Sequence, residues 1–166
     1  MALSGFNHNV GWHEFREVRQ RPRGAREDAR IRAEYPYTYR VQRQRDGGCR
    51  VASVRMRLGV VRSRSWAVRG RKTAALLRHE QGHYDITALG ARELYNQLTA
   101  LTVARCRNLR GAARRLERQI QARVDRANRR YDTQTAHGTN ATVQQTWETS
   151  IRAAKQRANG TIANLP

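Results

Sequence analysis

The chain has 166 residues, of which 39% are hydrophobic and 28% are charged, a composition typical of a globular protein with its own core. No run approaches the roughly 18 apolar residues that a membrane span needs, so we expect no membrane span. We expect a single domain over residues 1–166, with a β-rich part over about residues 1–70 and a helical part over about residues 71–166.

The charge balance is strongly positive. Lysine and arginine number 33 against 13 acidic residues, a formal net charge of +20, and only Lys72 and Lys155 are lysines. Such a charge favours binding to polyanions such as nucleic acid or acidic polysaccharide, although a GC-rich genome alone also favours arginine. Because the arginines are spread from Arg16 to Arg157, we expect nonspecific affinity for anions rather than dedicated nucleic-acid recognition.

The first third of the chain has the alternating pattern of β-strands. Every second residue from position 35 shares one face, namely Tyr35, Tyr37, Tyr39 and Val41. The turn signal RDGG follows, and residues 49–61 alternate again, which predicts a β-hairpin. Before the hairpin, residues 10–18 fit either a strand or a helix, and residues 22–35 predict a loop that leads into a short helix.

From Lys72 onward the apolar period is helical. The pattern predicts one helix from Lys72 to about Leu101 and a second from about Arg105 to Arg130. Their apolar stripes consist of Tyr84, Ala88, Ala91, Tyr95 and Leu98 in the first helix, and of Leu109, Ala113, Leu116, Ile120, Val124, Ala127 and Tyr131 in the second. Residues 131–142 break the pattern, and a last helix follows with Val143, Trp147, Ile151, Ala154 and Ala158 on one side. The predicted fold class is α+β, a small antiparallel sheet followed by packed helices.

The segment RHEQGHYDI, residues 78–86, carries the main chemical signal. His79 and His83 are four residues apart, so on a helix they lie about 40° apart around the axis and one turn apart along it. Both imidazoles can therefore bind one metal ion. Glu80 lies about 100° from His79, beside such an ion, where zinc hydrolases place a general base. Two surface histidines without a metal are the alternative, which the intervening glutamate disfavours.

A catalytic zinc needs a third protein ligand and an open position for water. Two acidic residues of the same helix are excluded by its geometry. Asp85 lies about 200° around the axis from His83, on the opposite side, and Glu93 lies roughly 15 Å further along the axis. The third ligand must therefore come from a distant segment.

His137 is the predicted third ligand, and Asp132 is the second choice, because an aspartate oxygen also binds zinc. His137 lies just where the second helix is expected to stop. If that helix packs antiparallel on the first, its end returns toward His79 and His83. The alternative for His137 is a loop histidine with no ligand role.

Two residues near the motif have more than one interpretation. Gly82 costs a helix about 1 kcal/mol relative to alanine, and it either lets another segment approach the metal closely or makes room for helix packing. Tyr131 either donates a hydrogen bond to the oxyanion of a tetrahedral intermediate or completes the apolar stripe of the second helix.

Cys49 and Cys106 are the two cysteines. They form no CxxC pair, so a cysteine zinc knuckle is excluded. They are either two free thiols in the core or one disulfide, which would contribute up to about 4 kcal/mol by closing a long loop.

The assembled motifs resemble those of a bacterial family of uncharacterised proteins, described as predicted secreted zinc-dependent proteases. The matching pieces occur in the expected order and are WHEFREVRQRPRG, CRVASVRMRL, LLRHEQGHYDI and YDTQTAHG, followed by Gln144 and Trp147. The resemblance implies a zincin-like metallopeptidase that carries the HEQGH motif on a long active-site helix. It implies His79 and His83 as zinc ligands and Glu80 as the catalyst.

The resemblance also implies His137 as the third ligand, a Cys49–Cys106 disulfide and export from the cell. The start of the sequence shows no basic segment followed by an apolar stretch. We therefore expect a secreted or periplasmic protein in its mature form, with a cytoplasmic location still open.

Two functions of different classes follow. The first is a zinc-dependent peptidase, in which Glu80 acts as general base toward a zinc-activated water that attacks a peptide bond of a peptide or protein substrate. The second is an arginine-rich protein that binds polyanions or nucleic acid and holds a structural metal. A structural site is closed by four protein ligands, whereas a catalytic site leaves one position for water.

Overall fold

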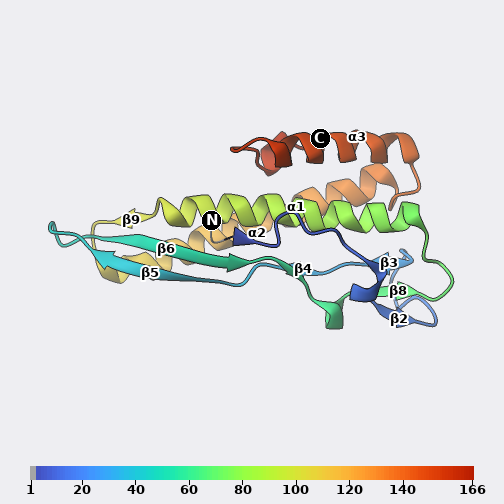
Figure 1. Cartoon of the computed structure of the whole chain (residues 1–166), viewed down its shortest axis with the longest axis horizontal. Helices are drawn as coiled ribbons and strands as arrows, with labels where there is room; N and C mark the ends of the chain where they lie inside the picture. Colours follow the sequence, from blue (N-terminus) through green and yellow to red (C-terminus); the bar gives the residue numbers. More distant parts are fainter. Residues whose placement is uncertain (1–2) are drawn as a thin grey trace.

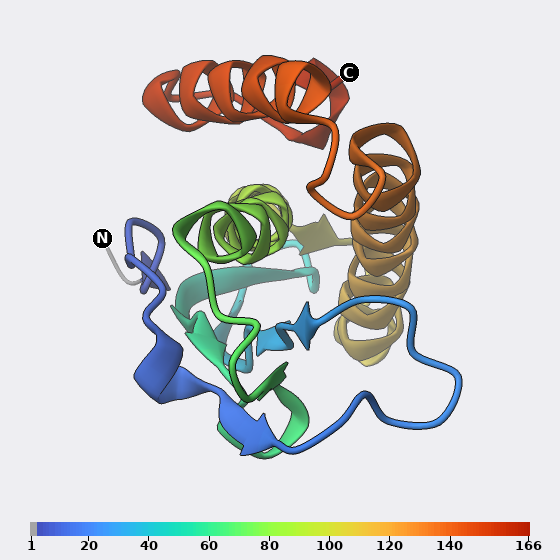
Figure 2. The ribbon, with the colours of Figure 1, turned by 90° about the vertical axis from the view of Figure 1, so that its right-hand side faces the viewer.

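The computed structural model describes residues 3–166. The helices in this range that exceed three residues are α1 (Ala74–Thr99), α2 (Leu109–Thr135) and α3 (Ala141–Gln156). Figures 1 and 2 show α1 at the centre of the molecule, with small sheets on one side, α3 on the opposite side and α2 along its flank. The α+β class predicted from the sequence is confirmed.

The strands gather into three small sheets. Their bounds are β1 (Leu3–Ser4), β2 (Arg16–Val18), β3 (Ala29–Arg30), β4 (Ala33–Glu34), β5 (Tyr37–Arg43), β6 (Cys49–Arg57), β7 (Gly59–Val60), β8 (Trp66–Val68) and β9 (Thr102–Val103). One sheet has the order β1-β6-β5 with β9 also paired to β6, a second has the order β2-β8-β3, and the third pairs β4 with β7. Because β1 runs parallel to β6 and β2 runs parallel to β8, the sheets are mixed and not purely antiparallel as expected.

The predicted hairpin is confirmed. Strands β5 and β6 pair antiparallel, with Tyr37 opposite Met56 and Arg43 opposite Cys49. Val51, Val54 and Met56 of β6 are buried, and a register irregularity opposite Arg40 and Val41 shifts the alternation by one residue between Val51 and Val54, so one face of the hairpin still packs on the core.

The segment 22–35 does not contain the short helix that its sequence predicts. It forms β3, which pairs with β8, and β4, which pairs with β7. Each of these strands has two residues, too few for a local periodicity to reveal. Upstream, residues 10–18 combine a 3₁₀ turn over Trp12–Glu14 with strand β2.

Helix α1 is buried on several sides. It begins after Thr73, whose side chain accepts a hydrogen bond from the amide of Leu76 and so caps the helix. Its bounds fall within two residues of those predicted. Its buried residues are His79, Glu80, Gly82, Tyr84, Ile86, Thr87, Ala88, Leu89, Gly90, Ala91, Glu93, Leu94 and Leu98. Because the helix is packed on several sides, its buried polar side chains are held in fixed positions, including those of His79 and Glu80.

Helix α2 is longer at its carboxyl end than its sequence predicts. We expected it to stop at Arg130, whereas it continues to Thr135 and ends where Ala136 and His137 adopt left-handed backbone angles. The last turn therefore includes Asp132, which lies on a helix rather than in a loop. Six of the seven residues of the predicted apolar stripe are buried, namely Leu109, Ala113, Ile120, Val124, Ala127 and Tyr131, and Leu116 is partly buried against the same core.

Helix α3 follows a short turn and packs back over α1. Asn140 caps its first turn by accepting a hydrogen bond from the amide of Val143, and Trp147, Ile151 and Ala154 of the predicted face are buried. The prediction was wrong for Ala158, which is exposed and lies beyond the end of the helix at Gln156. No helix within residues 3–166 is long and apolar enough to cross a membrane.

Cys49 and Cys106 form a disulfide. The bond joins the start of β6 to the short turn that precedes α2. The cysteines are 57 residues apart, so the bridge closes a long loop and contributes up to about 4 kcal/mol on the chain-entropy argument. The disulfide implied by the family resemblance is thereby seen in the structure.

Candidate metal centre

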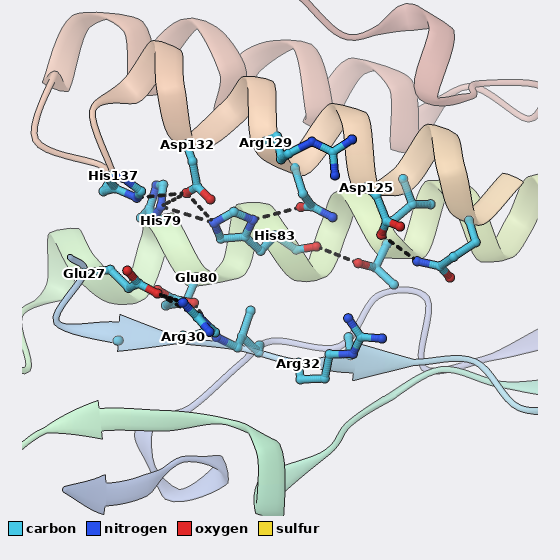
Figure 3. Close-up of a pocket in the computed structure, with 17 residues that line it drawn as sticks. Glu27, Arg30, Arg32, His79, Glu80, His83, Asp125, Arg129, Asp132 and His137 are labelled. Atoms are coloured by element: carbon cyan, nitrogen blue, oxygen red, sulfur yellow. Dashed lines mark hydrogen bonds and ion pairs between the residues drawn. The ribbon is translucent and has the colours of Figure 1, made fainter. Parts of the chain in front are cut away.

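The two histidines of the HEQGH motif face one carboxylate oxygen. The Nε2 atoms of His79 and His83 lie 3.2 Å apart, one turn from each other on α1. Asp132 Oδ1 lies 3.1 Å from the Nε2 atom of His79 and 2.9 Å from that of His83. Figure 3 shows Asp132 pointing down from α2 onto both rings. These three residues form a group that could hold one metal ion.

The antiparallel packing of α1 and α2 brings Asp132 to this place. The carboxyl-terminal turn of α2 crosses α1 near its amino-terminal third, as the Asp132 contacts require. Because α2 continues past residue 130, the carboxylate of Asp132 projects from a helix that is itself packed on the core. The ligand geometry is therefore fixed by two rigid elements.

His137 lies at the rim of the same centre. Its Nδ1 atom is 3.4 Å from Asp132 Oδ1, and its side chain is 43% exposed. The turn that carries it is held against α1 at Gly138, where a Cβ atom would lie 2.9 Å from Cβ of His79 and where φ is +83°. The structure thus brings His137 close to the other predicted ligands but places it outside the group of three converging ligand atoms.

The outer nitrogens of both imidazoles face amide oxygens. His79 Nδ1 lies 3.2 Å from Gln144 Oε1, and His83 Nδ1 lies 2.8 Å from Asn128 Oδ1. An amide oxygen accepts hydrogen bonds, so each neutral imidazole carries its proton on Nδ1. Both Nε2 lone pairs then point at each other and at a carboxylate oxygen. In that tautomer a cation between the three atoms, either a proton on Nε2 or a metal ion, offsets the repulsion between the lone pairs, so the arrangement is one that could hold a metal ion.

The charges of the centre are strongly coupled. Burial opposes protonation of His83, but its hydrogen bond to Asp132 and the charge of that carboxylate outweigh burial and raise the pKa of His83 to about 9. Burial favours the neutral form of Asp132 and so raises its pKa. The hydrogen bonds with His79 and His83 have a larger effect in the opposite direction, and the pKa of Asp132 lies well below its usual value. Asp132 is therefore an anion at neutral pH, as a metal ligand must be.

Glu80 lies beside the centre and is almost fully buried, with 1% of its surface exposed. Its Oε2 atom accepts a hydrogen bond of 2.7 Å from the backbone amide of Ile31, which lies between β3 and β4. Burial raises the pKa of Glu80, and the nearby His83 and His79 oppose this shift. No hydrogen bond from residues 3–166 reaches Oε1, so this oxygen is the one available for proton transfer.

Tyr131 supports His79 from beneath. Its ring stacks on the imidazole of His79, with centroids 4.6 Å apart and planes 15° apart. Its hydroxyl group donates to the backbone carbonyl of His79 at 3.2 Å and accepts from Gln144 Nε2 at 2.6 Å. The hydroxyl is buried and Tyr131 does not line the cavity described below. Tyr131 is therefore placed to hold His79 in position. The oxyanion role considered from the sequence would need its hydroxyl group to reach the substrate.

The two acidic residues excluded on helical geometry have other partners. Asp85 forms an ion pair with Lys155 of α3 at 2.6 Å, and Glu93 pairs with Arg123 of α2. Neither belongs to the group around His79. The exclusion of both from the metal centre therefore agrees with their positions in the structure.

A cavity of about 400 Å³ opens beside the centre. Its wall on one side is the segment from Glu27 to Ala33, and on the other side it is α2 from Gln121 to Asp132. His79, Glu80, His83 and His137 reach it from α1 and the turn after α2 (Figure 3). A molecule in this cavity would meet both the metal ligands and the carboxylate of Glu80.

Sequence reasoning assigned no role to three supporting groups: the side chain of Asn128, the side chain of Gln144, which it named only as part of the family resemblance, and the backbone amide of Ile31. Asn128 precedes Asp132 by one helical turn on α2, a spacing that places both on one face. With α2 predicted to end at Arg130, this signal was hidden. Nothing in the local sequence around Ile31 indicates its contact with Glu80.

The fold and this centre define an α+β protein with a candidate metal-binding site of two histidines and an aspartate. The chain belongs to a family of bacterial proteins of unknown function, DUF922, whose model matches residues 12–138. The match includes the HEQGH motif, Asp132 and His137, and it ends before α3. Among curated proteins nothing matches the chain, and nothing matches it among solved structures.

Proposed function

We propose that the protein is a zinc-dependent peptidase whose active site is the His79, His83 and Asp132 centre. The observation that carries the proposal is the convergence of three ligand atoms beside a buried glutamate, within reach of a cavity. Two imidazole nitrogens and a carboxylate oxygen make up a ligand set that zinc hydrolases use. The family description names no function, so the proposal depends on the site itself.

Zinc held by these three atoms would supply a Lewis acid that polarises the substrate carbonyl and lowers the pKa of the attacking water. Glu80 takes a proton from that water and returns it to the nitrogen of the leaving amine. Its raised pKa makes the carboxylate a stronger base than an exposed glutamate. The amide of Ile31 holds Oε2, which leaves Oε1 to carry the proton.

The remaining residues orient the ligands. Gln144 and Asn128 fix the tautomers of His79 and His83, so that Nε2 is the ligand atom in each ring. Tyr131 holds His79 through ring stacking and through its hydrogen bond to the backbone. His137, at the exposed rim, is either an additional ligand or a group that contacts the substrate. Metal analysis of variants distinguishes these roles.

The alternative function is an arginine-rich protein that binds polyanions and has a closed structural metal site. A closed site needs a fourth protein ligand, and the converging group within residues 3–166 has three. A cavity beside the centre also favours the catalytic interpretation. The disulfide is typical of proteins from oxidising compartments, which supports the expected secreted or periplasmic location.

The test is a titration of activity with metal. Protein stripped with a chelator is assayed against a mixed library of quenched fluorescent peptides while zinc is added back. We expect cleavage to rise linearly up to one zinc per chain and then to level. No cleavage at any zinc ratio would contradict the peptidase. Elemental analysis of the purified protein accompanies the assay, because iron(II) also binds to two histidines and one carboxylate, and one iron per chain would contradict zinc.

A further inference from the structure

A second cavity continues the first along α2. It has a volume of about 590 Å³ and shares Arg32, Ala33 and Gln121 with the cavity at the metal centre. The two cavities therefore adjoin along α2, and we name them together the α2 groove. Its near half is the metal-site cavity, and its far half is lined by residues 32–39 and by α2 from Arg110 to Gln121. In Figure 3, Asp125 on α2 and Arg32 on the facing segment lie on opposite sides of the metal-site cavity.

Two tyrosines join the walls of the far half. The hydroxyl of Tyr35 donates to Gln121 Oε1 at 2.8 Å, and that of Tyr37 donates to Glu117 Oε2 at 3.1 Å. The rings of Tyr37 and Tyr39 stack with centroids 6.4 Å apart. These contacts hold the strand wall and α2 together, so the groove is a rigid feature that exists before any ligand binds.

The charges of the far half leave two arginines free. Glu34 pairs with Arg64 at 2.5 Å, and Glu117 accepts the hydrogen bond from Tyr37. Within residues 3–166, neither Arg110 nor Arg114 has an ion pair or a side-chain hydrogen bond, and both are exposed. Glu117 keeps its negative charge when it accepts this hydrogen bond, so the charged residues that line the far half are three arginines, Arg32, Arg110 and Arg114, and two glutamates, Glu34 and Glu117, and their net charge is positive.

The near half has a different character. It is lined by the carboxylates of Glu27, Glu80, Asp125 and Asp132 and by the guanidinium groups of Arg30, Arg32 and Arg129, and Glu27 pairs with Arg30. A nucleic acid carries a negative charge at every residue, whereas the near half presents charges of both signs and so does not form the continuous positive track that a polyanion needs. A polypeptide can be uncharged in the near half and acidic in the far half.

We propose that the α2 groove binds an extended polypeptide substrate and that Arg110 and Arg114 select acidic side chains distant from the cleaved bond. The inference rests on the proposed peptidase function and adds its substrate class. With a rise of about 1.5 Å per residue, Arg114 lies about 27 Å and Arg110 about 33 Å from Asp132 along α2. An extended peptide advances about 3.3 Å per residue, so the acidic residues lie about eight to ten residues from the bond.

The experiment measures binding apart from cleavage. Fluorescence anisotropy measures the binding of labelled 20-residue peptides to the zinc-loaded Glu80→Gln variant. Each peptide has a neutral centre and carries aspartates, asparagines or lysines at one end. Both the amino-terminal and the carboxyl-terminal placement of these residues are tested. We expect the acidic peptide with the correct polarity to bind at least tenfold more tightly than its asparagine counterpart. The double variant Arg110→Glu/Arg114→Glu, made on the same background, should remove this preference and leave binding of the neutral peptide within twofold.

The matched control is Arg115→Glu/Arg126→Glu, which changes the net charge equally at exposed positions of α2 that do not line the groove. It should keep the preference for the acidic peptide. Equal weakening by both double variants, or no preference at all, would overturn the inference, as would an oligothymidylate that binds more tightly than the acidic peptide at physiological salt. If binding fails while peptides are cleaved, only the groove assignment is wrong; if cleavage fails while binding holds, only the peptidase is wrong.

Discussion

The hydroxyl group of Tyr131 occupies the space that a side chain at Gly82 would fill. A Cβ atom at Gly82 would lie 2.2 Å from the hydroxyl oxygen and 2.5 Å from the ring carbon that carries it. The contact involves the face of α1 that lies against α2, one residue before His83. The glycine that costs the helix stability thus allows α2 to approach α1 closely enough for Tyr131 to stack on His79.

The first prediction concerns this contact. Gly82→Ala should lower the free energy of unfolding by about 1–3 kcal/mol, because overpacking a rigid contact outweighs the gain in helix propensity. Urea denaturation of the zinc-free protein measures the change. Gly111→Ala is the control, since a Cβ there meets only a flexible arginine tip at 3.5 Å, and it should stabilise by up to about 1 kcal/mol. An alanine at position 82 that leaves stability unchanged would contradict the close approach.

The second prediction identifies the third ligand. Asp132→Asn should abolish stoichiometric zinc binding, because it removes the negative oxygen on which both imidazoles converge. His137→Ala should retain one zinc per chain and lose activity only if His137 contacts substrate. Zinc content after dialysis, measured by mass spectrometry, gives the result. Loss of zinc in both variants would show four protein ligands, which would favour the structural site of the alternative function.

The third prediction concerns Gln144, which bridges His79, Tyr131 and Glu148. Gln144→Ala removes the acceptor that fixes the tautomer of His79, so we expect zinc affinity to fall about tenfold to a hundredfold. Competition with a chromophoric chelator measures the affinity. Gln145→Ala, at the exposed neighbouring position, should bind zinc like the wild type. Wild-type affinity in the Gln144 variant would show that the hydrogen bond is not used.

The fourth prediction is a pH dependence of metal binding. In the metal-free protein, burial lowers the pKa of His83, but the hydrogen bond to Asp132 and the charge of that carboxylate have a larger effect and raise the pKa of His83 to about 9. Below that pH zinc must displace a proton, so its apparent affinity should rise about tenfold per pH unit towards pH 9 and level above it. Calorimetry at pH 7.5 in buffers of different ionisation heats should detect about one released proton per zinc. Affinity that stays constant from pH 7 to 9 would contradict the coupling of His83 to Asp132.

The part of the site that the sequence predicted best is local. The spacing of His79 and His83 and the place of Glu80 between them follow from helical geometry, which needs no tertiary information. Exclusion of Asp85 and Glu93 followed from the same geometry, and both have other partners in the structure. Local helical periodicity was therefore enough to predict which side chains of α1 face the candidate metal site.

The choice between His137 and Asp132 depended on where α2 ends. The expected end at Arg130 placed both residues beyond the helix, with His137 as the first choice and Asp132 as the second. The helix instead continues for another turn, in which buried Thr135 extends the apolar stripe one step beyond Tyr131. That step of four residues was the available signal. It places Asp132 one turn after Asn128, on the face that meets His83.

The missed strands β3 and β4 had no local signal of comparable strength. Each has two residues and exists because it pairs with a strand more than twenty residues later in the chain. Such pairing is set by tertiary contacts rather than by propensity. The amide of Ile31 between these strands holds Glu80, so the environment of the proposed base could not be derived from the motif alone.

The most direct test of the central claim is peptide hydrolysis by Glu80→Gln. Glutamine keeps the shape of the buried side chain but cannot take a proton, so the variant should bind one zinc per chain and lose at least a hundredfold in kcat. Its zinc content, its melting temperature and its rate on a quenched peptide that the wild type cleaves are measured on the same preparation. A variant with full zinc and wild-type hydrolysis would contradict the account.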